Sequence, residues 1–118
     1  MALKNLMSKL TKPVEEHDRE KLVEFCSRLE GCSAIDELRP RTVGRVVGEI
    51  SSVRIVPRAG APALEVGLSD GRGMVTAVFF GRRKIAGLSP GRRLVVEGMV
   101  APLGNRVFMY NPVYELLP

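Results

Sequence analysis

The sequence predicts a mainly β fold: a five-stranded barrel with an N-terminal helical arm and a short helix between the third and fourth strands. Three observations predict it. The apolar period is helical before residue 40 and alternating after residue 41. Clusters of Gly, Pro, Asp and Asn divide residues 41–118 into five apolar runs. The chain has 118 residues, which suits one modest core. We therefore expect an arm over residues 1–40 and a barrel over residues 41–118.

The arm contains two apolar stripes with helical spacing. The first consists of Leu3, Leu6, Met7 and Leu10, and Pro13 interrupts it. The second consists of Leu22, Phe25, Cys26 and Leu29, with acidic residues in its first turns, where the helix dipole favours them. We expect a helix over residues 14–30 whose second stripe covers the barrel or a partner. Because Pro13 separates the segments, removal of residues 1–12 should leave a folded domain.

The strands of the barrel follow from alternation. Residues 43–56 form a long first strand, and Gly44 and Gly48 within it predict a bulged, curved strand. After a loop at 57–62, residues 64–68 alternate as a half-buried second strand, and a turn at 70–73 leads to the third strand at 74–80. Residues 82–88 fit about two helical turns with Ile85 and Leu88 facing inward.

The remaining strands complete the predicted layout. The fourth covers 92–101, the fifth covers 107–110, and 113–117 adds a short extension. Strands one and four should pair, with Val46, Ile50, Leu94 and Val96 inward. Five strands, a coiled first strand and a helix between the third and fourth are typical of an OB-fold barrel. A five-stranded sandwich fragment is the alternative, but it does not explain the 82–88 segment.

The net charge of +5 is unevenly distributed. Residues 1–40 hold seven Lys/Arg and eight Asp/Glu, a net of −1, whereas residues 41–118 hold eleven and five, a net of +6. This predicts a polyanionic partner for the barrel, with a solvated basic surface as the alternative. No apolar run approaches the roughly 20 residues that cross a bilayer, and no signal peptide is recognisable. We therefore expect a cytoplasmic protein with no membrane partner.

An enzyme is hard to build from these residues. His17 is the only histidine, and Cys26 and Cys32 are too few for a disulfide framework or for a four-ligand zinc site. No nucleophile motif, dinucleotide fingerprint or phosphate loop is present. Most carboxylates of the barrel fit outward strand positions, and Asp70 fits a turn. We expect no catalytic activity, no cofactor and no metal.

Four segments in order resemble a known family: "VGRVVGEISSV", "LEVGLSDGRGMVTAVFFGR", "LSPGRRLVVEGMV" and "NRVFMYNPVYELL". Together they resemble the nucleic-acid-binding OB-fold of the RecG helicase wedge domain and of anticodon-binding-like modules, and most closely the small stand-alone OB-fold proteins of actinobacteria. The similarity covers roughly residues 40–117. It implies a five-stranded barrel and single-stranded or junction nucleic acid as the ligand. It does not imply helicase activity, because 118 residues cannot hold motor domains.

OB-folds bind oligonucleotides across strands two and three and the adjoining loops, with cations for phosphates and flat side chains for bases. Because side chains alternate along a strand, one of Phe79 and Phe80 points outward, but the alternation does not decide which. We take Phe80 as the candidate stacking residue. The two cation clusters that flank the 85–91 connector should gather at one rim and clamp a phosphate backbone. The candidate nucleic-acid-binding residues are Arg54, Arg58, Arg72, Phe80, Arg82, Arg83, Lys84, Arg92, Arg93, Arg106, Phe108 and Tyr110.

We thus expect a protein that binds single-stranded or branched nucleic acid with little sequence preference. The alternative is a protein-interaction or oligomerisation module that uses the barrel as a scaffold. In that case the N-terminal helices dock a protein partner or a second copy. An exposed apolar stripe in residues 1–10 would favour this alternative.

Overall fold

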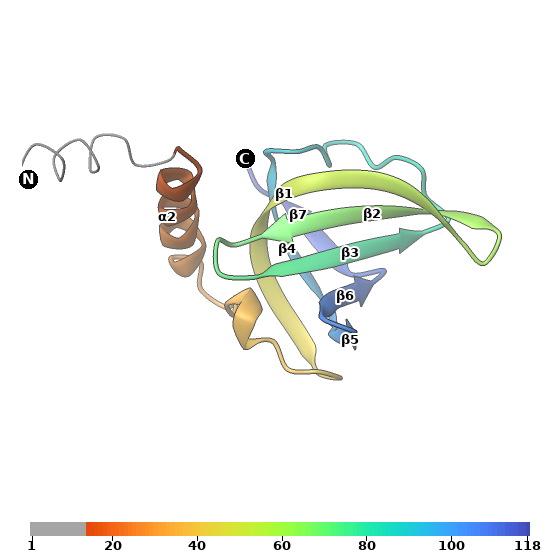
Figure 1. The fold of residues 1–118 in the computed structure, drawn as a ribbon, viewed down its shortest axis with the longest axis horizontal. Coiled ribbons are helices and arrows are strands. Elements are labelled where there is room, and N and C mark those ends of the chain that lie inside the picture. Colours follow the sequence, from red (N-terminus) through yellow and green to blue (C-terminus); the bar gives the residue numbers. More distant parts are fainter. Residues whose placement is uncertain (1–13) are drawn as a thin grey trace, which may run out of the picture.

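The computed structural model describes residues 14–118, which form one α-helix beside a strongly curved β-sheet (Figure 1). The first apolar stripe of the arm lies outside the described residues. The elements are α2 (Val14–Ser27), the 3₁₀ turn η1 (Ile35–Glu37), and the strands β1 (Val43–Arg58), β2 (Ala61–Ser69), β3 (Met74–Phe80), β4 (Arg93–Met99), β5 (Ala101–Leu103), β6 (Arg106–Tyr110) and β7 (Val113–Leu116). The predicted helix at 14–30 is confirmed over Val14–Ser27.

The sheet has seven strands in the order β5-β6-β3-β2-β1-β4-β7, so the expected closed five-stranded barrel is corrected. The predicted fourth strand breaks at Val100: β4 pairs with β1, whereas β5 pairs with β6. The C-terminal extension becomes β7 and pairs with β4. Because β5 and β7 are both edges, hydrogen bonding does not close the sheet. The β3–β6 pair is the one parallel pair between the described strands.

The predicted pairing of the first and fourth strands is confirmed. Val46 lies opposite Val96, and Leu94 lies opposite Gly48. These apolar residues and Ile50 are buried in the main core, which the inner faces of β1, β2, β3, β4 and β6 enclose. β1 is bulged between Ile50 and Ser52, as its length and glycines predicted.

The β1–β2 connection is a two-residue turn, where the sequence predicted a loop over 57–62. Ala59 and Gly60 both have positive φ, at 51° and 79°. Two consecutive residues with positive φ form a tight hairpin turn, and the twist of that turn matches the right-handed twist of the two strands it joins. Pro57 and Pro62 therefore lie opposite each other within the hairpin. The turn closes the hairpin tip that projects a short way beyond the end of β3 on the right of Figure 1.

The predicted helix at 82–88 is wrong, because residues 81–92 form an irregular connector. Gly81, Gly87 and Gly91 each adopt positive φ, which a right-handed helix does not allow. Ile85 and Leu88 are nonetheless buried in the main core, as their spacing predicted. The connector runs from the tip of β3 back over the sheet to the start of β4 beside α2 (Figure 1).

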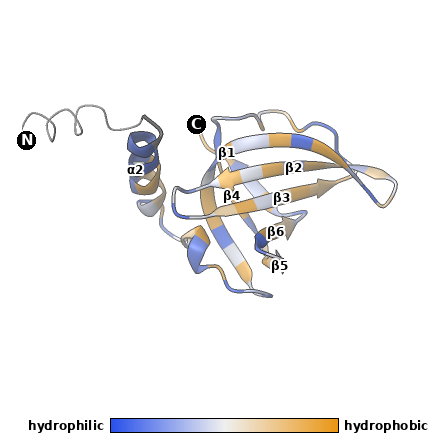
Figure 2. Ribbon diagram, viewed as in Figure 1, coloured by the Kyte–Doolittle hydropathy of each residue, from blue (hydrophilic) through white to orange (hydrophobic). Residues whose placement is uncertain are grey.

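A second apolar cluster joins α2 to the outer face of β1 and β4. Leu22 and Cys26 are buried against Val47 and Val95, with Phe25, Leu29, Cys32 and Leu117 packed around them. The predicted stripe thus covers the sheet. Figure 2 shows that hydrophobic residues are concentrated along the strands, whereas α2 is mainly hydrophilic. No helix among residues 14–118 is long and apolar enough to cross a membrane.

Candidate functional site

The outer face of β1, β2, β3 and β6 gathers most of the aromatic and several of the basic candidates. Strand register places Arg54, Glu65, Val78 and Tyr110 in one row across the four strands. The next row contains Ser52, Gly67, Thr76 and Phe108. Side chains at these positions point away from the main core, so the same face of the sheet presents both rows.

Three aromatic side chains form a stacked row on this face. The Tyr110 ring lies 5.6 Å from the Phe80 ring, at 17°, and 5.9 Å from the Phe108 ring, at 6°. Phe108 is buried with Ala63 and Val78, whereas Phe80 and Tyr110 are 44% and 37% exposed. Phe79 faces inward and is buried, which decides between the two adjacent phenylalanines. Two flat rings are therefore available to a ligand.

Three arginines surround one buried carboxylate beside the aromatic row. The Glu65 side chain is 5% exposed. It accepts hydrogen bonds from Arg58 Nη2 at 2.9 Å and Arg54 Nη2 at 3.3 Å, and Arg106 Nη2 lies 4.0 Å away. Hydrogen bonding to Glu65 is the main cause that raises the pKa of Arg58 above its ordinary value. The cluster carries three positive charges and one negative charge.

The same guanidinium groups cover the rings. Arg106 Cζ lies 4.7 Å from the centre of the Phe108 ring. Arg58 Cζ lies 5.7 Å from the Phe108 ring and 5.8 Å from the Tyr110 ring. At these distances the ring quadrupole attracts the cation. The face is therefore one connected set of aromatic and cationic groups, and not a scatter of separate charges.

Asn111 connects the strands that carry the aromatic row. Its side-chain oxygen accepts a hydrogen bond from the Phe80 backbone N–H at 2.9 Å. Its own backbone N–H donates to the Val78 carbonyl at 2.7 Å. Asn111 adopts φ 48°, in the left-handed region that asparagine tolerates better than most residues. This link fixes the end of β6 against β3 and holds Tyr110 beside Phe80.

A polar hollow of about 290 Å³ continues the face beyond Phe108. Ser52, Thr76, Asn105 and Arg106 supply its polar groups. Arg106 donates a hydrogen bond to the Thr76 hydroxyl at 3.4 Å. The hollow gives the face a depression lined by hydroxyl and amide groups and one guanidinium at one end of the aromatic row.

The structure does not gather all the predicted cations at one rim. Arg82, Arg83 and Lys84 are exposed and follow Phe80, whereas Arg92 and Arg93 lie at the opposite end of the connector (Figure 1). Arg93 Cζ lies 4.2 Å from the centre of the Phe25 ring of α2, and its Nε lies 3.5 Å from Glu49.

Arg72 also lies away from the aromatic row. It forms ion pairs with Asp36 at 3.1 Å and Glu37 at 3.6 Å. Asp70 forms the predicted turn: its carboxylate accepts the N–H groups of Arg72 and Gly73, each at 2.9 Å, and also that of Ile35 at 2.8 Å.

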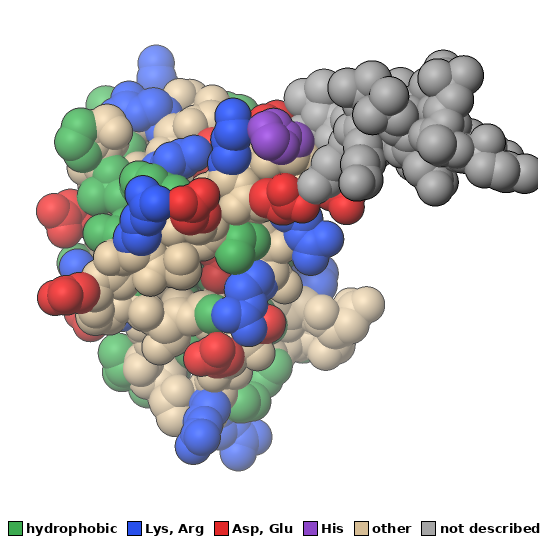
Figure 3. Space-filling model, turned by 90° about the vertical axis from the view of Figure 1, so that its left-hand side faces the viewer, with side chains coloured by type: hydrophobic (Ala, Val, Ile, Leu, Met, Phe, Trp, Pro, Cys, Tyr) green, Lys and Arg blue, Asp and Glu red, His purple; other side chains and the backbone are tan. Residues whose placement is uncertain are grey.

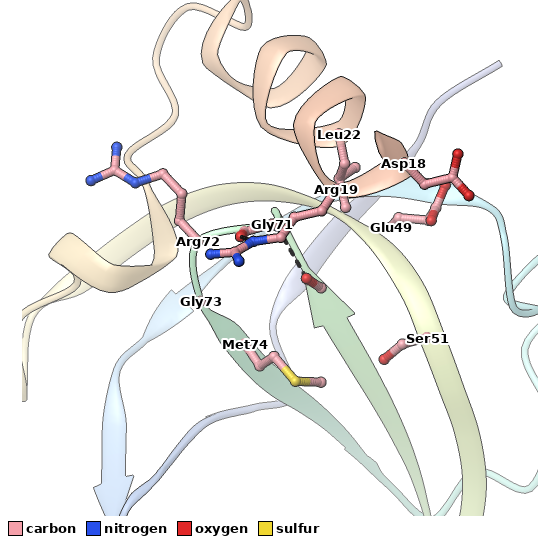
Figure 4. A pocket seen from close by; sticks show the side chains of 10 residues that line it. Asp18, Arg19, Leu22, Glu49, Ser51, Gly71, Arg72, Gly73 and Met74 are labelled. Atoms are coloured by element: carbon pink, nitrogen blue, oxygen red, sulfur yellow. Dashed lines mark hydrogen bonds between the residues drawn. The ribbon is translucent and has the colours of Figure 1, made fainter. Parts of the chain in front are cut away.

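A hollow of about 500 Å³ lies between α2, β1 and the β2–β3 turn (Figure 4). Arg19 lies across Gly71 and donates to its carbonyl at 2.6 Å, whereas the Arg72 guanidinium points away from the hollow. Asp18 and Glu49 add negative charge to the opposite wall. This mixed lining favours a polyanion less than the arginine-rich face does.

The side of the molecule that carries α2 has no single-sign surface. Figure 3 shows Lys/Arg and Asp/Glu side chains interspersed over that side. Ion pairs such as Arg45 with Glu115, at 3.7 Å, account for part of this mixture. The excess positive charge of residues 41–118 is therefore not concentrated beside the helix.

Chemistry based on metals or thiols has little support in the described part of the chain. No group of three or more His, Cys, Asp or Glu residues within it could hold a metal ion. Cys26 and Cys32 are free. Burial, with a contribution from the nearby Asp70 charge, raises the pKa of Cys26 to about 11. A thiol in this environment stays protonated near neutral pH and is a poor nucleophile.

Sequence reasoning missed Glu65 as a structural centre and Asn111 as a strand link. Glu65 was expected to point outward from the sheet, and it does so. Its side chain is nevertheless buried, because three arginines surround it. The signal for Glu65 is the two-residue turn at 59–60, because that turn sets the register in which Arg54 opposes Glu65. For Asn111, the sequence holds an Asn-Pro turn signal but nothing that predicts its contact with Phe80.

Comparison with known proteins identifies the fold. No protein-family model and no curated protein sequence matches the chain. Several solved structures share its architecture, and three of them match at 20–22% identity. A chain of the S. pombe Stn1–Ten1 complex matches with a TM-score of 0.52 over 64% of this chain and 57% of its own. The OBody AM1L10, bound to hen egg-white lysozyme, matches at 0.58 over 75% and 95%.

RecG bound to a three-way DNA junction matches with a TM-score of 0.61 over 95% of this chain and 16% of its own. Because residues 41–118 are only two-thirds of the chain, this likeness also includes part of the segment before β1. The chain has an OB-like fold, as its resemblance to the RecG module implied. It spans about 57% of the Stn1–Ten1 chain and 16% of the RecG chain.

Proposed function

We propose that this protein binds single-stranded or branched nucleic acid, without catalysis and with little sequence preference. The observation that carries the proposal is the Phe80–Tyr110–Phe108 row with its arginine cluster on the β2–β3 side of an OB-like fold. In OB-folds this face and its adjoining loops bind oligonucleotides. We place this activity in the cytoplasm.

The exposed rings suit unpaired bases. Stacking on an aromatic side chain contributes about 1–3 kcal/mol per base and tolerates every base, because each has a flat π-face. Within the aromatic row, Phe80 and Tyr110 are the two rings with substantial exposure. In a duplex the bases are already stacked on one another, so this face favours a single strand or an unpaired region at a junction.

The cations suit a phosphate backbone. Arg54 and Arg106 flank the row, and Arg82, Arg83 and Lys84 continue the positive charge beyond Phe80. Within the described residues, no ion pair involves the side chains of residues 82–84, so they are free to meet a polyanion. Contacts of this kind attract every sequence alike, because phosphates carry no base information. DNA bound to RecG, a protein of similar fold, supports this ligand class for the present chain.

The experiment is a salt-dependent titration of the protein with a fluorescently labelled oligothymidylate and a matched duplex. For about three phosphate contacts, the slope of log affinity against log salt is about −2 for a single strand. Affinity should then fall about 20-fold between about 50 and 200 mM salt. Replacing residues 82 and 83 with alanine should flatten the slope without changing base preference.

The protein-interaction alternative has one observation in its favour. Val43, Met99 and Val113 are exposed on the outer face of β1, β4 and β7. The similar OBody is described as bound to lysozyme, a protein. A wild-type protein that binds neither DNA nor RNA at low salt would contradict the nucleic-acid proposal and leave this alternative in first place.

A further inference from the structure

Glu65 is the unexpected residue of the proposed interface. It is an acidic side chain at the centre of a face that should attract a polyanion, and it is 5% exposed. A buried carboxylate is costly unless charged or hydrogen-bonding groups compensate it. Its compensation comes entirely from arginines that belong to the proposed binding surface. The presence of this carboxylate within the face therefore needs an explanation.

The three arginines are not held equally. Arg58 reaches Glu65 Oε2 with two nitrogen atoms, Nε at 3.3 Å and Nη2 at 2.9 Å. Arg54 reaches Oε1 with one nitrogen at 3.3 Å, and Arg106 is 4.0 Å from Oε1, beyond hydrogen-bonding distance. Exposure separates the best-held arginine from the other two: the side chain of Arg58 is 27% exposed, whereas those of Arg106 and Arg54 are 53% and 61% exposed.

Glu65 is also rigidly placed. It lies on the central strand β2, opposite Arg54 on β1 and Val78 on β3. A carboxylate fixed in this way offers two oxygens to three cations that would otherwise repel one another, although Arg106 is also held by its hydrogen bond to Thr76. Long arginine side chains lose considerable conformational freedom when they are ordered, so a fixed partner lowers the entropic cost of presenting them to a ligand.

We propose that Glu65 is a positioning residue that holds Arg58 in place beside the aromatic row and orients Arg54 so that it transfers to a phosphate oxygen on binding. Arg58 then remains on Glu65, beside the Phe108 and Tyr110 rings. Arg54 and Arg106 are the phosphate ligands of this face. The inference rests on the proposed function and assigns separate roles within it.

The consequence runs against simple electrostatics. Substituting Glu65→Gln removes a negative charge and raises the net charge of the protein from +5 to +6. If charge alone governed binding, affinity for a polyanion would rise. If Glu65 positions the arginines, affinity falls, because Arg54 loses the partner that orders it, whereas Arg106 keeps its hydrogen bond to Thr76.

The test is a salt titration of Glu65→Gln with a labelled oligothymidylate of about 15 nucleotides, a length within the range of OB-fold sites. We expect affinity to fall about fivefold or more at low salt. The slope against log salt should become shallower by about 0.7, the value of one lost phosphate contact. The matched control is Glu97→Gln on β4, which makes the same change in charge on another part of the sheet and should bind as tightly as the wild type or slightly more tightly.

Two further variants test the separate roles without changing Glu65. Arg106→Gln should flatten the slope by about 0.7, whereas Arg58→Gln should lower affinity and leave the slope unchanged. These two measurements test the separate roles of Arg58 and Arg106 even if Glu65→Gln does not fold.

Binding by Glu65→Gln that equals or exceeds that of the wild type would overturn the inference. So would weaker binding with an unchanged slope and a lower melting temperature, which indicates a structural role alone. Equal slopes for Arg58→Gln and Arg106→Gln would also overturn it. In each of these cases the wild-type protein still binds the oligonucleotide. If the proposed function itself fails, the wild-type protein binds no oligonucleotide.

Discussion

Arg93→Ala should destabilise the protein without altering its interaction with nucleic acid. The guanidinium lies 4.2 Å from the centre of the Phe25 ring and its Nε lies 3.5 Å from Glu49. A half-desolvated cation–π contact contributes about 1 kcal/mol, and a partly exposed ion pair adds roughly 0.2–1 kcal/mol. The expected loss is therefore about 1–2 kcal/mol, which corresponds to about 5–10 °C in melting temperature for a domain of this size.

Circular dichroism melting of the variant measures this loss, and Arg92→Ala is the matched control. Arg92 is the adjacent arginine, it is exposed, and no described contact joins it to α2. We expect Arg92→Ala to have the same melting temperature as the wild type. This reasoning would be refuted if the Arg93→Ala protein had the melting temperature of the wild type but bound the oligonucleotide more weakly and with a shallower salt dependence. Arg93 would then belong to the binding rim, as the sequence predicted.

Three further outcomes follow from the structure. Tyr110→Ala should weaken oligonucleotide binding by about 1–3 kcal/mol, the loss of one stacked base, with an unchanged salt slope in the same titration. Gly87→Ala should lower the denaturation midpoint more than Gly91→Ala: both glycines have positive φ, but at Gly87 an added Cβ would also lie 2.6 Å from Leu116 Cδ2. Because burial holds the Cys26 thiol neutral until about pH 11, whereas an unfolded thiol ionises near 9.0, stability should fall as pH rises between these values. Urea melts should show this fall in the wild type and a smaller one in Cys26→Ala.

The bulge of the first strand, its pairing with the fourth and the side of each that is buried were predictable from the apolar period and the glycines. Val46, Ile50, Leu94 and Val96 alternate with outward residues, and that alternation determines which face is buried. The second stripe of the arm was equally readable, since its apolar spacing matches one face of a helix. Local patterns of this kind do not depend on distant contacts.

The errors arose where backbone geometry overrides side-chain pattern. Ile85 and Leu88 have helical spacing and are buried, yet the positive φ of the flanking glycines excludes a helix. The apolar run of the fourth strand gives no sign of the break at Val100, because β4 and β5 differ only in which neighbour they pair with. Strand number therefore depends on pairing that no local pattern specifies.

The candidate site was predictable in composition but not in arrangement. The sequence selected Arg54, Arg58, Arg106, Phe108 and Tyr110, and the structure brings them together with Phe80. It could not separate these cations from Arg72 and Arg93, whose partners are acidic and aromatic residues far away in the chain. Which partner an arginine pairs with, and on which face of the molecule, depends on tertiary contacts, and charge counts do not contain that information.

The most direct measurement of the central claim is an NMR titration of the ¹⁵N-labelled protein with an unlabelled oligothymidylate at low salt. The account predicts that amide shifts concentrate on the outer face of β2, β3 and β6, from Glu65 through Thr76–Phe80 to Arg106–Tyr110. The amides of α2 and of Val95 beneath it should not move. Shifts confined to α2 and the Arg93 region, or no shifts at all, would contradict it.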